Sequence, residues 1–319
     1  GEDGFQAKEL QKLTAWLKDD YKPDIVHLTN SMFAGFARTF KRELGVPVVC
    51  SLQGEDLVLD QLREPWKAQV FEVLRERAKD VDGFVVNSRW YGDRMAEYLD
   101  VSPDRMHVVP LGLSLAGHGE PKPPSEGPLT VGYLARVCPE KGIHILVDAF
   151  RLVAAERPGK VRLRVAGYLG ERDRKFLEEQ EAKLRSWGLA DAYEYAGEID
   201  RDAKIRFLQS LSVLSVPTVY REPKGLFVLE ALANGVPVVE PRHGAFPELI
   251  EATGGGLLVD PGSPGDLARG IGELLDDPAR RQELGRRGRE AVQARFSDEA
   301  EADNALAVYQ QVLAGRVAA

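Results

Sequence analysis

The stretch REPKGLFVLEALANGVPVV, residues 221–239, predicts a helix followed directly by a β-strand. Pro223 predicts a turn before it and suits the first turn of a helix, since its ring fixes φ and removes one N–H donor. Gly235 and Pro237 predict the end of that helix, and VPVVE (236–240) predicts a short buried strand. A helix that leads into a buried strand is the repeating unit of α/β proteins.

The same alternation of β-rich runs and helical periods extends over most of the 319 residues. It predicts an α/β fold in which parallel sheets carry helices on both faces. In the first half, the expected helices are 5–19, 32–43, 60–79 and 89–99, and the expected strands are 24–29, 46–52, 83–88 and 107–110. In the second half, the expected strands are 129–134, 161–167, 192–197, 212–217, 236–240 and 256–260. We therefore expect two Rossmann-like domains with a cleft between them, and ligands bound at the carboxyl ends of the strands.

A segment without periodicity separates the two halves. Residues 112–128, GLSLAGHGEPKPPSEGP, are rich in Gly, Pro and Ser, which is the composition of a linker. We expect a partial N-terminal domain at 1–118, a C-terminal domain at 119–298, and a final helix at 299–319 that crosses back toward the first domain. The first domain has about four expected strands against six, and the chain opens on a helix. We therefore expect its beginning to be missing.

Charge and composition exclude several functional classes. The formal net charge of −8 argues against nucleic acid as the main partner, because phosphate binding needs clustered Lys and Arg. The sequence shows neither an export signal nor a membrane-spanning run. Cys50 and Cys138 lie in separate halves without a CxxC or His/Cys cluster, which indicates a cytoplasmic protein without a zinc site. The basic run 279–295 is either a solvated helix face or a contact with the inner face of a membrane.

Two glutamates surround the start of the helix in the opening stretch. The N–H groups of Gly225, Leu226 and Phe227 are expected in or near its first turn, where unpaired amides attract anions such as phosphate. Because a carboxylate beside a diphosphate would repel it, Glu222 and Glu230 are expected to bind sugar and ribose hydroxyls instead. The alternative is that Glu222 caps the helix and that Glu230 is an exposed helical residue.

A second stretch, VGYLARVCPEKGIHIL (131–146), follows an expected strand and carries two cations. Arg136 and Lys141 stand five residues apart around a turn, just before a helix that starts near Gly142. Both cations could meet one diphosphate and offset the negative charge that builds up on a leaving nucleoside diphosphate, without a metal. The alternative is that they are surface charges on a strand-to-helix loop.

Together the two stretches resemble the retaining family 4 glycosyltransferases of the GT-B fold. EPKGLFVLEALANGVPVV resembles the family's E-x7-E element, and ARVCPEKG resembles its Arg and Lys phosphate element. The resemblance spans most of residues 22–315 in the family's order. Its further segments are YKPDIVHLTN, VDGFVVNSRW, MHVVPLGL, VRLRVAG, EYAGEI, HGAFPELI and GLLVDPGSPGDLA.

This resemblance implies an enzyme of glycan biosynthesis that moves a hexosyl or related sugar from a nucleoside-diphosphate sugar to a hydroxyl acceptor. The acceptor would be a sugar, a lipid-linked glycan or a small molecule. The anomeric configuration would be retained, and the departing phosphate oxygen would take the acceptor's proton. No opposed pair of carboxylates is then needed, in contrast to glycoside hydrolysis. Neither a metal nor another cofactor is implied.

The resemblance also assigns roles to single residues. It implies three catalytic residues, with Arg136 and Lys141 on the diphosphate and Glu222 on the hydroxyls of the transferred sugar. Glu230 would bind the ribose, and Gln53 would contact the donor sugar from the first domain. The other implied contacts of the nucleotide sugar are Glu198, Ile199, Gly225, Leu226 and Phe227.

Two departures from the family pattern keep rival functions open. Gln53 replaces a histidine that many members have, and glutamine forms hydrogen bonds but is not a titrating base. Lys224 replaces the usual aromatic residue, so it either favours an acidic or unusually decorated donor sugar or points to solvent. The rivals are a nucleotide-sugar epimerase on the same fold and a non-catalytic nucleotide-sugar-binding subunit. Turnover of the donor would distinguish the three functions.

Overall fold

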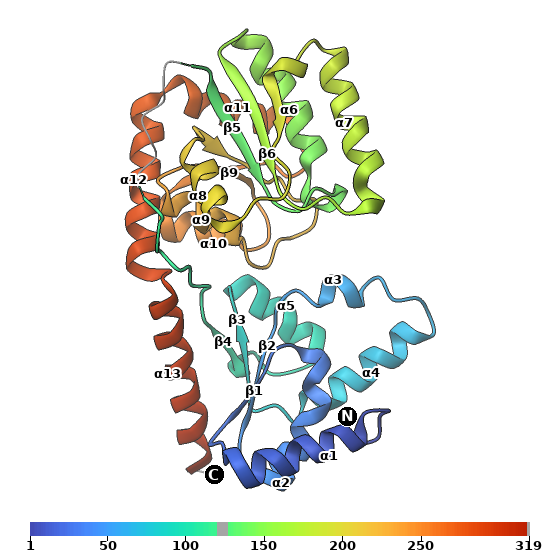
Figure 1. Ribbon diagram of the computed structural model, residues 1–319. Helices are drawn as coiled ribbons and strands as arrows, with labels where there is room; N and C mark the ends of the chain where they lie inside the picture. Colours follow the sequence, from blue (N-terminus) through green and yellow to red (C-terminus); the bar gives the residue numbers. More distant parts are fainter. Residues whose placement is uncertain (120–126, 318–319) are drawn as a thin grey trace. The chain divides into compact units, whose positions relative to one another are not determined.

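The structure is a computed structural model that describes residues 1–119 and 127–317 (Figure 1). The chain forms two compact units: the first combines Gly1–Leu111 with the C-terminal segment that starts at Glu299, and the second is Gly112–Asp298. The predicted linker 112–128 falls partly on residues 120–126, which lie outside the described residues.

The first unit is built on four parallel strands that pair in chain order, β1-β2-β3-β4. Parallel neighbours need crossover connections, which here contain the helices. The strands are β1 (Val26–Leu28), β2 (Val48–Ser51), β3 (Gly83–Val86) and β4 (Met106–Val108). The α-helices are α1 (Ala7–Trp16), α2 (Ala37–Leu44), α3 (Asp56–Leu59), α4 (Trp66–Ala78), α5 (Arg89–Leu99) and the C-terminal α13 (Asp298–Val317). Short turns are the π-helix η1 (Leu17–Tyr21) and the 3-10 helices η2 (Ser31–Phe36) and η3 (Pro103–Arg105).

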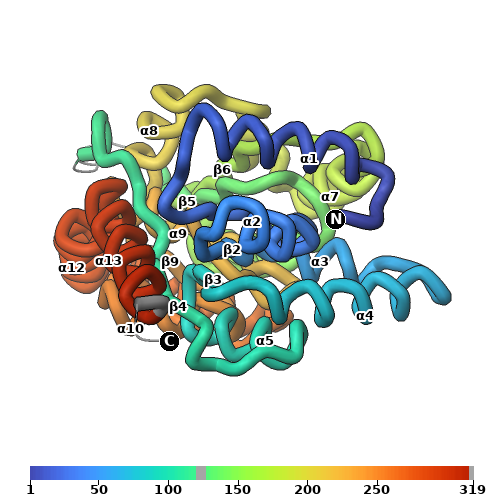
Figure 2. Tube along the Cα trace, turned by 90° about the horizontal axis from the view of Figure 1, so that it is seen from below, coloured from blue at the N-terminus to red at the C-terminus, as the bar shows by residue number. Residues whose placement is uncertain are grey.

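Both faces of this sheet are covered, because successive strand residues point to opposite sides. Val48 and Phe84 belong to the core that the sheet forms with the helices before and between its strands. Val49 and Val85 face the other way and pack with Val308 of α13. Figure 2 shows α13 on one side of β3 and β4, and α1 and α2 on the other.

The second unit has six parallel strands in the order β10-β9-β8-β5-β6-β7. The strands are β5 (Leu129–Leu134), β6 (Val161–Ala166), β7 (Tyr193–Tyr195), β8 (Val213–Leu214), β9 (Val238–Pro241) and β10 (Gly256–Val259). From β5 the chain first builds the sheet toward β7 and then returns to add β8 on the other side of β5. The order therefore reverses between β5 and β8, and in open α/β sheets ligands bind at the carboxyl ends beside such a reversal.

The helices of the second unit connect these strands. They are α6 (Ile143–Glu156), α7 (Arg174–Ser186), α8 (Arg201–Gln209), α9 (Leu226–Ala233), α10 (Phe246–Thr253), α11 (Pro264–Asp276) and α12 (Pro278–Arg295), with 3-10 turns η4 (Pro139–Lys141), η5 (Glu171–Asp173) and η6 (Ala190–Ala192). Each of the ten predicted strands is confirmed, with ends that differ by at most three residues. The predicted helix 60–79 is wrong at its start, since α4 begins only at Trp66, directly after Pro65. A proline inside the helix would have removed one backbone hydrogen bond.

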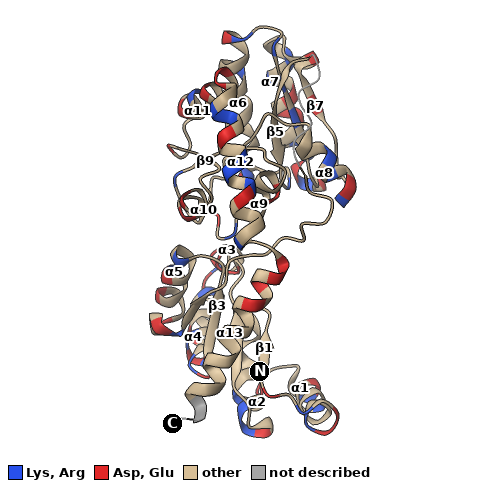
Figure 3. Cartoon of the chain, turned by 90° about the vertical axis from the view of Figure 1, so that its left-hand side faces the viewer, with Lys and Arg blue, Asp and Glu red and all other residues tan. Residues whose placement is uncertain are grey.

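The basic run 279–295 lies on α12, along which basic and acidic residues are interspersed (Figure 3). Arg286 pairs with both Glu283 and Glu290, and Arg287 pairs with Glu283. Two arginines of this helix are thus paired within it, although it carries more basic than acidic residues. In the part of the chain that the structure describes, no helix has the length and apolar character that crossing a membrane requires.

Candidate active site

The reversal of strand order brings two loops together at the carboxyl end of the second sheet. Residues 135–142 follow β5, and residues 215–225 follow β8, which pairs directly with β5. A backbone hydrogen bond of 2.9 Å from Val219 N–H to the Glu140 carbonyl oxygen ties the two loops. The predicted phosphate loop and the predicted Glu222 loop are therefore neighbours.

Glycines let the backbones in this region approach closely. Gly142 has a φ of 76°, and a Cβ added there would lie 1.8 Å from the Pro217 carbonyl oxygen. Gly244 has a φ of 59°, and a Cβ there would lie 2.4 Å from the Glu222 carbonyl oxygen. The backbone of Glu222 is further held by a 2.8 Å hydrogen bond from Ala245 N–H. No other residue type fits these two positions without moving the site.

We expect Gly142→Ala to destabilise the protein by about 3 kcal/mol or more, because it adds backbone strain and a clash with Pro217. Gly159→Ala is the matched control: Gly159 has a similar φ of 70°, but nothing lies within 4 Å of an added Cβ. Strain alone should cost the control about 1 kcal/mol. Urea unfolding measures both changes, and equal losses would show that the two loops do not pack as described.

Glu222 is buried, with 5% of its surface exposed, and its carboxylate is fully engaged. Its Oε2 accepts hydrogen bonds from Lys141 Nζ at 2.7 Å and from the Tyr220 hydroxyl at 2.6 Å. Its Oε1 faces the backbone N–H groups of Lys224 and Gly225 at 3.3 and 3.4 Å, just before α9 begins. Glu222 thus holds the backbone just before α9 and pairs with Lys141, but among the described residues no amide of α9 itself donates to its side chain, as the capping alternative would require.

Electrostatics keep this carboxylate charged. Burial alone would raise the pKa of Glu222, but the Lys141 ammonium and the hydrogen bonds from Tyr220 and Gly225 outweigh it, so the pKa lies below its usual value. The ammonium also lies over two aromatic rings, 5.1 Å from the centroid of Tyr220 and 5.4 Å from that of Phe227. Lys141 is therefore held by one carboxylate and two ring faces.

Glu230 is also buried, with 6% of its surface exposed, so the alternative of an exposed helical residue is wrong. Its Oε1 pairs with Lys204 Nζ of α8, which balances the buried charge. The next turn of α9 is fixed by Asn234, whose Nδ2 donates to the Glu230 carbonyl oxygen at 2.9 Å and to His118 Nδ1 at 2.8 Å.

The remaining predicted residues of the second unit lie on the loop after β5, on the loop before α8 and at the start of α9. Arg136 is exposed on the loop after β5 and forms no ion pair among the described residues. Glu198 is exposed and Ile199 half-buried, in the loop between β7 and α8, the helix that carries Lys204. Gly225 adopts a φ of 68° at the start of α9, where Leu226 is exposed and Phe227 buried.

Gln53 belongs to the first unit, in the loop after β2. Its backbone N–H donates to Glu55 Oε2 at 2.6 Å, and its Nε2 donates to the Thr29 carbonyl oxygen at 3.2 Å. Gly54 N–H donates to the Tyr91 hydroxyl at 2.8 Å, and that hydroxyl donates to Asp56 at 3.0 Å. Two buried carboxylates thus fix the backbone of this loop at the carboxyl end of its sheet.

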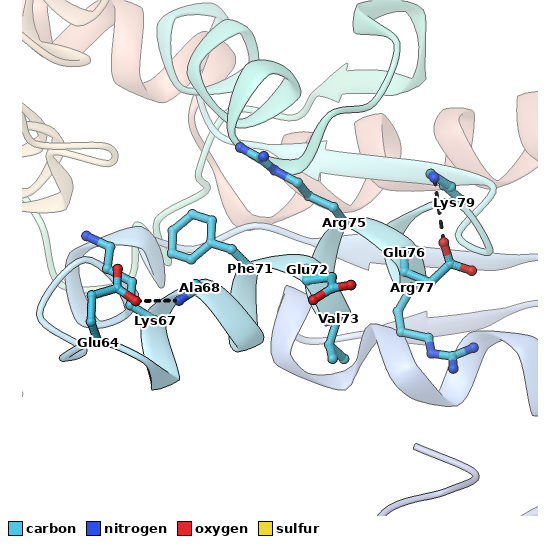
Figure 4. Close-up of a pocket in the computed structure, with 10 residues that line it drawn as sticks. All are labelled: Glu64, Lys67, Ala68, Phe71, Glu72, Val73, Arg75, Glu76, Arg77 and Lys79. Carbon is cyan, nitrogen blue, oxygen red and sulfur yellow. Dashed lines mark hydrogen bonds and ion pairs between the residues drawn. The ribbon is translucent and has the colours of Figure 1, made fainter.

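A separate surface hollow of about 850 Å³ lies along α4 of the first unit, where Lys67, Phe71 and Arg75 project from the helix (Figure 4). Acidic and basic residues alternate along it, and Lys67 and Arg75 both lie near the Phe71 ring. None of the predicted site residues lines this hollow. Its surroundings do not resemble a phosphate or sugar site.

Three residues of the site region were missed by the sequence analysis. Tyr220 lies two positions before Glu222 in the same loop, so its position was a usable signal. Lys204 is 26 residues from its partner, and no local pattern marks it. Glu240 interrupts the apolar run of β9 and is fully buried, which a strand pattern alone does not predict. Among the described residues, no group of three or more His, Cys, Asp and Glu side chains could hold a metal ion.

Comparisons with known proteins agree with this architecture. Residues 119–291 match the family described as glycosyl transferases group 1, and residues 4–112 match the glycosyl transferase 4-like domain. A D-inositol 3-phosphate glycosyltransferase from Acidothermus cellulolyticus is 28% identical over 311 residues, which is 92% of this chain and 68% of that protein. The chain spans 51% and 63% of the length of two other curated relatives.

Solved structures show the same fold. Sucrose-phosphate synthase from Thermosynechococcus elongatus superposes with a TM-score of 0.78 at 23% identity, over 97% of this chain and 78% of that one. HepE of Anabaena, in complex with UDP, gives a TM-score of 0.79 at 18% identity, over 97% of this chain and 82% of that one. Both likenesses confirm the predicted GT-B fold. Since the family model covers more than half of its residues, this chain belongs to the group 1 glycosyl transferases.

Proposed function

We propose that this chain is a retaining glycosyltransferase that moves a hexosyl or related sugar from a nucleoside-diphosphate sugar to a hydroxyl acceptor. The observation that carries the proposal is the Lys141–Glu222 pair beside the reversal of strand order. It places a cation suited to a diphosphate next to a carboxylate suited to sugar hydroxyls. Family membership supports the reaction class.

Each group has a role in this proposal. Arg136 and Lys141 bind the diphosphate and stabilise the charge that develops as it leaves. Glu222 accepts hydrogen bonds from the transferred sugar, and Glu230 accepts them from the ribose. The amides at the start of α9, from Gly225 to Phe227, favour negative charge beside them. The departing phosphate oxygen takes the acceptor's proton, so no protein base is required.

The nucleotide, the acceptor and the location are parts of the proposal. HepE was solved with UDP, so UDP is the first nucleotide to try here. Glu198 and Ile199 are proposed to lie near the base, and Gln53 is proposed to reach the donor sugar. We propose a cytoplasmic protein whose acceptor is a sugar, a lipid-linked glycan or a small molecule. A peripheral membrane contact through α12 stays a prediction, and the ion pairs on that helix weaken it.

Thermal unfolding with UDP, GDP, ADP and dTDP tests the donor site. A nucleotide at one hundred times its dissociation constant should add about 2.7 kcal/mol to the stability of the wild type. Arg136→Ala and Glu230→Gln should lose this gain, because they remove a phosphate contact and a ribose contact. Lys160→Ala removes the same charge from the residue before β6, at the opposite end of the sheet, and should keep the gain.

If none of the four nucleotides stabilises the wild type, the proposed donor site is wrong. If one of them does, assays with the nucleotide sugars of that nucleotide distinguish the rival functions. Release of the nucleoside diphosphate from the nucleotide sugar supports a transferase, and binding without turnover supports a non-catalytic subunit. A changed stereocentre in the sugar would support an epimerase.

A further inference from the structure

In the proposed reaction, two negatively charged groups compete for the Lys141 ammonium: the Glu222 carboxylate and the diphosphate of the donor. In the structure its ammonium lies 2.7 Å from Glu222 Oε2 and close to two ring faces, with 18% of its side chain exposed. A diphosphate carries more negative charge than one carboxylate, so a bound donor would draw the ammonium toward the phosphates. Among the described residues, Lys141 is the one cation paired with Glu222, which would then be left without a counter-charge.

Losing that partner is costly for a carboxylate buried to this degree. A buried charge without a counter-charge is strongly destabilising, unless hydrogen bonds replace the lost attraction. Among the described residues, Glu222 would keep three donors. The two backbone amides on Oε1 are long, at 3.3 and 3.4 Å, so they contribute weakly. The third donor is the Tyr220 hydroxyl on Oε2, at 2.6 Å, which is the length of a strong charge-assisted bond.

Several contacts hold Tyr220 in this position. Thr218 Oγ1 donates to the Tyr220 carbonyl oxygen at 3.0 Å, and the next residue back, Val219, is tied to the phosphate loop through Glu140. Burial and the nearby Glu222 charge both raise the pKa of the Tyr220 hydroxyl, so it remains a donor at neutral pH. Its ring faces the Lys141 ammonium, so one side chain touches both partners of the ion pair.

We propose that Tyr220 is a positioning residue of the donor site: its hydroxyl holds the Glu222 carboxylate so that Lys141 can turn from Glu222 to the diphosphate of the donor. This inference rests on the proposed function. In this inference, Glu222 competes with the donor's diphosphate for the Lys141 ammonium. The hydrogen bond from the Tyr220 hydroxyl lowers the free-energy cost of breaking the Lys141–Glu222 ion pair. Glu222 stays in place, ready for the hydroxyls of the sugar.

A double-mutant cycle tests this role with Tyr220→Phe, Glu222→Gln and the double variant. Titration calorimetry measures the dissociation constant of the nucleoside diphosphate, among UDP, GDP, ADP and dTDP, that binds the wild type. Tyr220→Phe keeps the ring and should weaken binding about tenfold, because Lys141 then leaves behind a poorly bonded carboxylate. Glu222→Gln removes the competitor and should tighten binding, on the order of tenfold.

The decisive comparison is Tyr220→Phe in the Glu222→Gln background. Without a carboxylate to hold, the hydroxyl has little to contribute, so its removal should change the dissociation constant by less than about twofold. An equal loss in both backgrounds would show a merely structural role for Tyr220. Weaker binding by Glu222→Gln would show that Glu222 does not compete for Lys141. Either result overturns the inference while the proposed function stands.

A different result identifies failure of the function itself. If the wild type binds none of the four nucleoside diphosphates, the donor site is wrong, and the role of Tyr220 falls with it. Thermal unfolding of the four proteins without ligand accompanies the titrations. It verifies that each variant is folded when its affinity is measured.

Discussion

Lys141→Met is expected to destabilise the ligand-free protein by about 3–5 kcal/mol at neutral pH, the usual cost of removing one partner from a buried ion pair. Methionine keeps most of the alkyl volume between the Tyr220 and Phe227 rings, so the loss reports on charge rather than on packing. Glu222 would remain buried without the ammonium that now lies 2.7 Å from it. Urea unfolding of both proteins at pH 7 measures the difference.

The pH dependence of this loss has a definite sign. In the wild type the folded-state pKa of Glu222 is lowered, so the pair stabilises the fold above the unfolded pKa and this contribution is lost as the pH falls through the folded pKa. Without Lys141, burial dominates and raises the pKa. The variant then loses stability as the pH rises above the ordinary glutamate value of about 4.3. The two proteins should therefore differ most at neutral pH and little in acid.

Two further variants control this experiment. Lys141→Met combined with Glu222→Gln removes both charges and should recover most of the lost stability, since no charge stays buried. Lys183→Met breaks an exposed pair with Asp148, in which both side chains are more than one third exposed. That change should cost less than about 1 kcal/mol. If Lys141→Met costs no more than Lys183→Met, the Lys141–Glu222 pair is not buried in solution.

Periodicity was sufficient to predict the fold, because parallel strands buried on both faces appear as short apolar runs between helical segments. It located the ten strands of the described residues and predicted α13, which begins one residue earlier than expected. It failed in 60–79, where the helical pattern continues across Pro65 although α4 begins after it. The spacing of apolar residues does not reveal that a proline lacks an N–H group. A prediction of helix ends therefore has to consider the position of each proline as well as the apolar pattern.

The sequence predicted which loops carry the site residues, but not which of these residues contact one another. Sequence spacing placed Lys141 after one strand and Glu222 after another, but the two lie 81 residues apart and meet only because β8 pairs with β5. Strand order is not encoded in the period of a strand. For the same reason the Lys204–Glu230 pair could not be foreseen, and Tyr220 had no assigned partner until the loop geometry was known.

Glu240 is a second feature that the sequence pattern did not predict, because its carboxyl group is buried inside a strand. It lies on β9 with 0% of its surface exposed, and the only hydrogen bonds to its side chain among the described residues come from Val216 N–H, at 3.1 and 3.3 Å. One amide cannot replace the hydration of a carboxylate. Burial therefore raises the pKa of Glu240 well above its ordinary value, and the nearby Glu222 charge raises it further.

Glu240→Gln is expected to make the protein more stable, by an amount that grows with pH. A group whose folded pKa is raised stabilises fully below its unfolded pKa and loses that contribution as the pH rises toward the folded pKa. The wild type should thus lose about 1.4 kcal/mol for each pH unit above the ordinary glutamate value, until the folded group itself ionises. Glutamine has nearly the same shape, can accept the hydrogen bond from Val216 and carries no proton to lose.

Urea unfolding of wild type and Glu240→Gln across a pH series measures this difference. The two proteins should be similar near the ordinary glutamate pKa and diverge steadily as the pH rises. Glu178→Gln, an exposed change on α7, should stay within about 0.5 kcal/mol of the wild type throughout. If the curves of wild type and Glu240→Gln run parallel instead, Glu240 is ionised in the folded protein. A cation would then have to approach its carboxylate, and Lys141, whose charge already acts on it, would be the first candidate to test.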